Sequence, residues 1–238
     1  MKKIFSLLAI VYSVAAFAQK KTVINDKNAE PRSIKGFHAI KVSGGIDLYL
    51  SHGDEAAAVS ASDIGYRDKI KTEVENGVLT IWYDGDMFNR ILFNNRRNLR
   101  VYVSYTELDM VTATAGSDVL VDGTINGKSL TLKFSSGADF KGNVDVAELN
   151  VDLSSGSDIK MGGKANTVFI GTSSGSDFNG YALVAEVCTA KGSSGSDINI
   201  TVNKELNAHA SSGSGIHYKG SPALHTSTSS GGSVSRRS

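Results

Sequence analysis

Apolar or small residues alternate with polar residues over stretches of about ten positions throughout the second half of the chain. In one stretch, Leu149, Val151, Leu153 and Ile159 share the same parity. A repeat of two residues is the period of a β-strand, and nothing in this half has the spacing of an amphipathic helix. The same parity returns in three further stretches, residues 111–121, 168–178 and 206–216. The pattern therefore predicts strands that bury one face.

A five-residue motif, of the form Ser155-Gly156-Ser157-Asp158-Ile159, recurs seven times, the last two copies being degenerate. The spacing between successive leading glycines is 21, 19, 19, 20, 18 and 18 residues. A period of this length is typical of a leucine-rich repeat or of one coil of a β-solenoid. Because the leucine and asparagine pattern of the former is missing, we predict an all-β, single-stranded β-solenoid with coils of about 19 residues.

The parity of the motif places both of its serines inward and its glycine and aspartate outward. Inward serines about 4.8 Å apart between coils would hydrogen-bond to one another in ladders, because a hydroxyl both donates and accepts. The outward glycine suits a bend in the strand.

The aspartates of the motif are expected to form one outward column. Neighbouring carboxylates about 4.8 Å apart repel by roughly 0.9 kcal/mol in water, so the column needs a compensating interaction. One interpretation is that the carboxylates hydrogen-bond to turn amides, and the other is a weak divalent-cation or polar-ligand site. The column consists of Asp118, Asp139, Asp158, Asp177 and Asp197.

Residues 33–110 are also rich in predicted strands, but they lack the repeat. Alternating residues lie on both sides of Asn76-Gly77, which is the strongest short signal for a β-hairpin. Further strands are predicted around Ile40, over residues 46–50 and over residues 99–105, with a single helical turn within residues 62–70. We expect this part to form the first, irregular coils of the solenoid.

These residues resemble the head GIN domain of putative auto-transporter adhesins. The resemblance rests on the segment from Phe37 to Leu50, which contains Ser43-Gly44-Gly45-Ile46-Asp47, on the segment from Ile70 to Ile81, and on the Ser-Gly-Ser-Asp repeats. Asp47 stands where the family name has asparagine. The resemblance covers about residues 33–234 and implies an exported, right-handed β-helix-like protein of bacteria with an outer membrane. It implies no catalytic residues.

Residues 1–18 have the pattern of a secretory signal peptide, with Lys2 and Lys3 before a short apolar run and Ala16-Phe17-Ala18 at its end. We expect an exported protein, in the periplasm, on the outer-membrane surface or secreted, with no transmembrane segment after cleavage. The predicted organisation is a signal peptide at 1–18, an N-terminal linker at 19–32, the β-rich N-terminal part at 33–110, the repeat solenoid at 111–234 and a tail at 235–238.

Composition and charge exclude several classes of function. A formal net charge of +1 argues against a nucleic-acid binder, which needs a basic surplus. A single cysteine, Cys188, excludes an intramolecular disulfide and a multi-cysteine metal site, and its parity predicts a buried side chain. The five histidines have no metal-ligand spacing, and no cofactor is predicted.

The basic and aromatic stretch 87–97 interrupts the strand pattern. It is either a surface loop whose apolar residues pack on the solenoid or a loop that binds a partner. The residues proposed for partner binding are Phe88, Arg90, Phe93, Arg96 and Arg97.

The repeated serines and aspartates are explained by coil packing, so the sequence favours a non-catalytic binding protein, an adhesin. Its partner would be an envelope or extracellular glycan or protein. The alternatives are a polysaccharide-active lyase or hydrolase and a purely structural envelope protein. For an enzyme, the only candidate group off the repeat register is Asp84, Asp86, Arg90 and Arg96.

Overall fold

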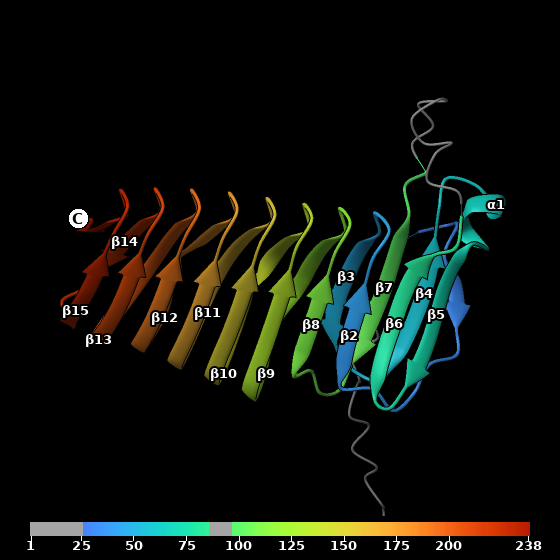
Figure 1. Ribbon diagram of the computed structural model, residues 1–238. Helices are drawn as coiled ribbons and strands as arrows, with labels where there is room; N and C mark the ends of the chain where they lie inside the picture. The colour runs from blue at the N-terminus through green and yellow to red at the C-terminus, as the bar shows by residue number, and fades with distance from the viewer. Residues whose placement is uncertain (1–25, 86–96) are drawn as a thin grey trace, which may run out of the picture.

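The computed structural model describes residues 26–85 and 97–238, and in these residues sixteen strands form one sheet wound into a solenoid (Figure 1). Five long strands each supply one coil, and each pairs in parallel with the next. They are β9 (Asp118–Phe134), β10 (Asp139–Leu153), β11 (Asp158–Thr172), β12 (Asp177–Gly192) and β13 (Asp197–Ala210). The predicted solenoid is confirmed, with about seven turns and coils about 19 residues apart.

The pairing register stacks like residues of the repeat on one another. Asp158 pairs with Asp177 and Asp177 with Asp197, while Leu149 pairs with Val168. Because every second residue points inward, the paired apolar residues form one continuous core along the axis of the solenoid.

A tight turn forms at the first two residues of every copy of the motif. Ser155 and Gly156 have φ of 56° and 68°, and the same two positions have positive φ in all seven copies. Only the second serine is inward: Ser157 is fully buried, whereas Ser155 is exposed. The prediction that both serines point inward is therefore wrong. Two successive residues in the left-handed region bend the chain, so strand alternation does not continue through the turn.

The inward serines bond mainly to the backbone rather than to one another, which corrects the predicted serine ladders. Ser157 Oγ lies 2.9 Å from the carbonyl oxygen of Ser154 in its own turn and 3.0 Å from that of Phe134 in the preceding coil. A hydroxyl pair also occurs, between Thr172 Oγ1 and Ser196 Oγ at 2.8 Å. The carbonyl oxygen of Phe134 also accepts the backbone N–H of Ser154, so the serine hydroxyl uses the second lone pair of that oxygen and is itself satisfied inside the core.

The N-terminal part supplies the first coils, as predicted. β2 (Ala39–Val42) pairs in parallel with β8 (Met110–Ala113), and β3 (Asp47–His52) pairs in parallel with β9. Gly44 and Gly45, with φ of 90° and 72°, make the turn between β2 and β3. On the other side of this coil lie β6 (Val78–Tyr83) and β7 (Arg100–Tyr105).

Antiparallel strands close this end of the solenoid. β5 (Ile70–Glu75) forms the predicted hairpin with β6 through Asn76-Gly77. β4 (Ala56–Ser60) is antiparallel to β7, and β1 (Glu30–Arg32) is antiparallel to β4. The predicted helical turn is α1 (Ile64–Arg67), which Asp63 caps by accepting a hydrogen bond from Tyr66 N.

The last coil is more exposed and more polar than those before it. β14 (Gly215–Lys219) pairs with β13, as does β15 (Ala223–Thr228), and β16 (Ser233–Arg236) pairs with β14. All six residues of β15 are exposed. Inward positions that hold Ala208 and Ala210 in β13 hold Thr226 and Thr228 in β15.

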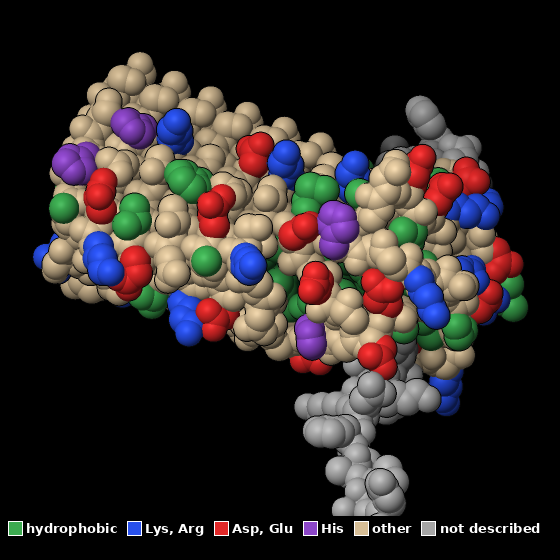
Figure 2. All heavy atoms as spheres, turned by 90° about the horizontal axis from the view of Figure 1, so that it is seen from below, with side chains coloured by type: hydrophobic (Ala, Val, Ile, Leu, Met, Phe, Trp, Pro, Cys, Tyr) green, Lys and Arg blue, Asp and Glu red, His purple; other side chains and the backbone are tan. Residues whose placement is uncertain are grey.

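Charges of both signs are interspersed over the face seen from below, without a large single-sign patch (Figure 2). Ion pairs join neighbouring coils: for example, Lys164 Nζ lies 3.1 Å from Asp145 Oδ2, and Lys204 Nζ lies 3.0 Å from Glu186 Oε2. In the described part of the chain, no helix has the length and apolar character that crossing a membrane requires.

Candidate functional site

The five motif aspartates form the column that the sequence predicted, on the outer side of β9 to β13. The carboxylates of Asp139, Asp158 and Asp177 each accept a hydrogen bond from the backbone N–H of the aspartate one coil further. The Oδ1 atom of Asp139 lies 3.1 Å from the backbone N of Asp158, and the corresponding distances are 3.2 Å from Asp158 to Asp177 and 3.1 Å from Asp177 to Asp197. These bonds link one coil to the next and offset part of the repulsion between carboxylates.

The column is electrostatically unfavourable at its more enclosed positions. Partial burial raises the pKa of Asp158, and the neighbouring carboxylates of Asp139 and Asp177 act in the same direction, while the hydrogen bond from Asp177 opposes them. Burial likewise raises the pKa of Asp118, with Asp139 and Asp47 adding to the effect. Asp118 and Asp158 thus hold their protons more tightly than ordinary aspartates do.

Asp47 extends the column into the N-terminal part, which sequence reasoning missed. Leu48 pairs with Val119, so the preceding residues Asp47 and Asp118 lie side by side on β3 and β9. The signal was present in the sequence, because Gly44-Gly45-Ile46-Asp47 has the glycine and aspartate of the repeat motif without its serine.

The cation hypothesis for the column stays a prediction. Within residues 26–85 and 97–238, no three His, Cys, Asp or Glu side chains are arranged so that they would hold a metal ion. Each of the three hydrogen bonds above also occupies a carboxylate oxygen.

A shallow groove of about 460 Å³ runs beside the column over the same face. Its other side is a second outward row, which includes Leu120, Lys141, Lys160 and Asn179 in successive coils. Toward the N-terminal end, the row continues into Tyr49 and Tyr102, whose rings stack with centroids 5.1 Å apart.

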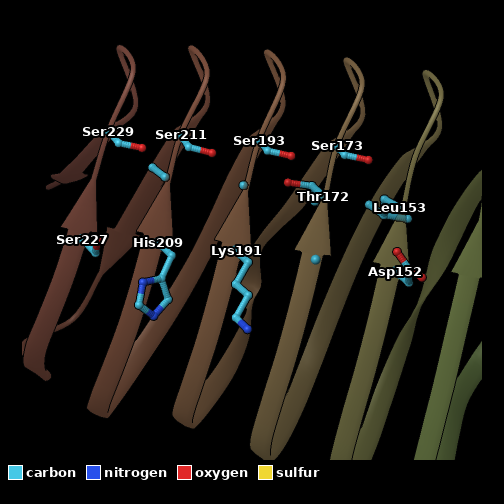
Figure 3. A pocket seen from close by; sticks show the side chains of 13 residues that line it. Asp152, Leu153, Thr172, Ser173, Lys191, Ser193, His209, Ser211, Ser227 and Ser229 are labelled. Carbon is cyan, nitrogen blue, oxygen red and sulfur yellow. The ribbon is translucent and has the colours of Figure 1, made fainter.

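Two further hollows lie on the face formed by the C-terminal halves of the long strands. One encloses about 430 Å³ below the Ser-Gly turns, where Ser173, Ser193 and Ser211 line up coil after coil (Figure 3). The other encloses about 280 Å³ and is lined by Asn150, Phe169 and Thr189, among others. The two hollows share the residues Asp152, Gly171 and Lys191.

Phe169 and Gly171 both break the repeat on the outward side of β11. The positions that flank Phe169 in the adjacent coils carry Asn150 and Thr189, so an aromatic replaces a polar residue. Phe169 is 43% exposed.

Gly171 has no side chain, whereas the residues at the same position in the two adjacent coils, Asp152 and Lys191, are charged. Figure 3 shows the side chains of these two residues on the strands either side of the one that carries Thr172. Sequence reasoning missed this feature, although a comparison of the repeats position by position would have found it.

The proposed partner-binding loop lies mostly outside the described residues, which include Arg97 but not Phe88, Arg90, Phe93 or Arg96. The guanidinium carbon of Arg97 is 4.8 Å from the ring centroid of Tyr83 and 5.7 Å from that of Tyr66, within the range of cation–π contacts.

Of the group considered for catalysis, only Asp84 is described, and Asp86, Arg90 and Arg96 are not. The backbone N of Asp84 donates to Lys69 O at 2.8 Å.

Cys188 is fully buried beside Ala190, as its parity predicted. Burial raises the pKa of its thiol to about 12, so the thiolate is absent at neutral pH. The cysteine acts as a small apolar core residue.

Comparison with protein families gives one match, over residues 36–222. The family is described as "Putative auto-transporter adhesin, head GIN domain". No curated protein sequence matches the chain significantly.

Several solved structures share the fold. A putative adhesin from Bacteroides fragilis has a TM-score of 0.78 at 17% identity, covering 87% of this chain and 94% of that one. A putative adhesin from Parabacteroides distasonis has a TM-score of 0.72 at 20% identity, covering 88% and 96%. A putative lipid binding protein from the same species has a TM-score of 0.68 at 19% identity, covering 90% and 98%. At these identities, the likeness is one of fold.

Proposed function

Because this chain belongs to the family of putative auto-transporter adhesins with the head GIN domain, we propose that it is an exported, non-catalytic adhesin whose solenoid presents a long face for binding. Its partners would be glycans or proteins of the envelope or of the extracellular space. The proposed signal peptide at residues 1–18 would place the mature chain, from Gln19, outside the cytoplasm.

The observation that carries this proposal is the stacking of outward side chains in register from coil to coil. On one face Asp158, Asp177 and Asp197 follow one another, and on the other Ser173, Ser193 and Ser211 do. Such rows repeat every 4.8 Å or so along the axis, which suits several weak contacts to one polymer or surface. Linked weak contacts give high avidity without a deep pocket.

The chemistry of the described residues supports binding over catalysis. The serines at the second serine position of the motif are buried in five copies, and those at the first position lie in the turns; the buried ones are Ser117, Ser157, Ser176, Ser196 and Ser214. Within residues 26–85 and 97–238, one serine–histidine hydrogen bond is found, between His217 Nδ1 and Ser235 Oγ at 2.8 Å. In the parts of the chain that the structure describes, no carboxylate hydrogen-bonds to the other ring nitrogen, so the third member of a catalytic triad is missing there.

Lipid binding, suggested by the name of one fold relative, has less support in this chain. A lipid surface or acyl chain needs a continuous apolar patch. The exposed large apolar side chains among the described residues lie on four different elements, and they are Ile64, Phe169, Val184 and Leu224.

The test is to incubate the purified mature chain with intact bacterial cells and isolated envelopes, and to measure how much protein sediments with them. The same preparation is assayed for release of reducing ends from acidic polysaccharides. We expect saturable binding and no turnover. Turnover that is lost on the substitution Asp84→Asn or Asp86→Asn would overturn the proposal in favour of the enzyme. The absence of both binding and turnover would favour a structural role.

A further inference from the structure

We propose that the notch at Phe169 and Gly171 is a binding site for a pyranose ring of a glycan. The inference rests on the proposed function and names the chemistry and place of one contact. The notch is defined by six outward residues of β10, β11 and β12, in two rows of three, and they are Asn150, Phe169 and Thr189 beside Asp152, Gly171 and Lys191.

Coil packing does not explain the two residues that break the repeat. Phe169 points outward and is 43% exposed, so much of its apolar ring contributes nothing to stability through burial. Gly171 has no positive φ, and a Cβ added there would meet only Val151 O, at 4.0 Å. The fold therefore tolerates a side chain at Gly171, and the absence of one opens the hollow.

The polar groups around the notch are available to a ligand. Asp152 and Lys191 stand two coils apart, on the order of 9.6 Å between their Cα atoms, with Gly171 between them. In the described part of the chain, neither side chain forms an ion pair or a hydrogen bond. Both are exposed, so a carboxylate and an ammonium group face the same hollow without a protein partner.

These groups match the chemistry of a sugar better than that of other ligands. One face of a pyranose is lined by C–H groups and packs on an aromatic ring such as Phe169, while its rim of hydroxyls both donates and accepts. Asp152 would accept from these hydroxyls, and Lys191 would donate to them. The apolar surface is one ring wide, which suits a sugar and is too small for a lipid chain.

The notch is open along the solenoid axis, so it admits one ring of a longer chain. Its hollow joins the larger one below the Ser-Gly turns, where Lys191, His209 and Ser227 continue the outward row toward the C-terminal end (Figure 3). Neighbouring sugars of a linear glycan would lie over this polar row. The sugar ring that packs on Phe169 would fix the position of the whole glycan along the row.

The test uses the mature chain on an array of neutral and uronic-acid oligosaccharides, followed by calorimetric titration of the best ligands. The variants are Phe169→Asn, which restores the polar residue of the adjacent coil, and Gly171→Gln, which fills the notch. Phe169→Tyr keeps the aromatic face, and Val184→Thr removes an exposed apolar group elsewhere on β12. We expect at least a tenfold loss of affinity in the first two variants and less than a twofold change in the two controls.

The outcomes separate this inference from the proposed function. If the wild-type chain binds cells or envelopes but no arrayed glycan, the sugar site is wrong and the adhesin proposal stands. Glycan binding that survives in both Phe169→Asn and Gly171→Gln would also overturn the site. Glycan binding that depends on the notch, in a protein that does not bind cells or envelopes, would support the site and contradict adhesion. Melting curves of all variants show whether each one is folded.

Discussion

The backbone N–H of Asp177 donates a hydrogen bond to Oδ1 of Asp158, 3.2 Å away on the preceding coil. The same relationship joins two further pairs of aspartates in the column. A carboxylate that repels its neighbours is thus also a link that holds successive coils in register. Substitutions that separate charge from hydrogen-bonding capacity distinguish the two effects.

The change Asp158→Asn keeps the acceptor oxygen and removes the charge. The pKa of Asp158 is raised by burial and by the carboxylates of Asp139 and Asp177, so the folded state holds this proton more tightly than the unfolded chain. Its ionisation therefore costs stability above the folded pKa, and the cost disappears as pH falls through that pKa. Because Asp158 is exposed and solvent screens its interactions, we expect Asp158→Asn to raise the free energy of unfolding by only a few tenths of a kcal/mol at pH 7.

Urea unfolding at pH 7 and near pH 3 measures this effect, and the gain should vanish at the lower pH. Asp152→Asn serves as the control, because Asp152 is exposed and lies outside the column. Asp158→Ala removes the acceptor as well and should be less stable than Asp158→Asn by about 1 kcal/mol. A gain that persists at pH 3 would contradict the electrostatic explanation.

Calcium tests the cation hypothesis for the column. If the column binds the ion, millimolar calcium raises the Tm of the wild-type chain, because a ligand that binds only the folded state stabilises it. The double substitution Asp158→Asn and Asp177→Asn should then remove the rise. Thermal scans with calcium or with magnesium, at constant ionic strength, make the measurement. A wild-type Tm that does not respond to either ion would eliminate the site and leave the hydrogen bonds as the role of the column.

The change Gly175→Ala tests the cost of the left-handed turn. Gly175 has a φ of 66°, and an added Cβ would have no heavy atom within 4 Å, so the penalty comes from the backbone alone. We expect a loss of about 1–2 kcal/mol in the free energy of unfolding. Gly171→Ala is the matched control, since Gly171 has no positive φ, and it should be neutral or stabilise the protein by up to about 1 kcal/mol. Equal losses in both variants would refute the argument.

The two serines of one motif should respond differently to substitution. Ser157→Ala leaves the carbonyl groups of Phe134 and Ser154 without their buried hydroxyl, so we expect a loss of about 0.5–1.5 kcal/mol. Ser155→Gly relieves a positive φ of 56° at an exposed position and should cost nothing or stabilise the protein. Chemical denaturation of both variants measures these changes. If Ser155→Gly were the more destabilising of the two, the assignment of Ser157 as the buried serine would be contradicted.

Cys188 should be inert toward thiol reagents in the folded protein. Its side chain is fully buried, and the pKa of its thiol is raised to about 12. We expect Ellman's reagent to react only after denaturant is added, at the rate of unfolding. Cys188→Ala should destabilise the protein less than Cys188→Ser. The serine hydroxyl would be buried without a hydrogen-bond partner, which costs about 1–3 kcal/mol of stability. Rapid modification of the native protein would show that this coil opens.

The sequence by itself determined the features that depend on local alternation and on the period of the repeat. Burial of every second residue in a strand appears in the sequence as an alternation of apolar and polar residues. The strands, the inward Cys188 and the outward aspartates were therefore all predictable. The hairpin at Asn76-Gly77 was equally local, because asparagine and glycine are the residue types that most readily adopt the positive φ this turn requires.

Only the tertiary structure decided which residues outside the repeat motif meet across coils and how the turns point. The serine in the first position leaves the core because two successive left-handed residues bend the chain, and this conformation is not visible as a change in hydrophobic pattern. Asp47 joins the column through pairing of β3 with β9, across 71 residues of sequence. Phe169 and Gly171 become a notch only because parallel pairing sets Asp152 and Lys191 on either side of them. The constant period of the motif sets the inter-coil register within the repeats, but outside the motif the register depends on the backbone ladder, and local sequence patterns leave it open.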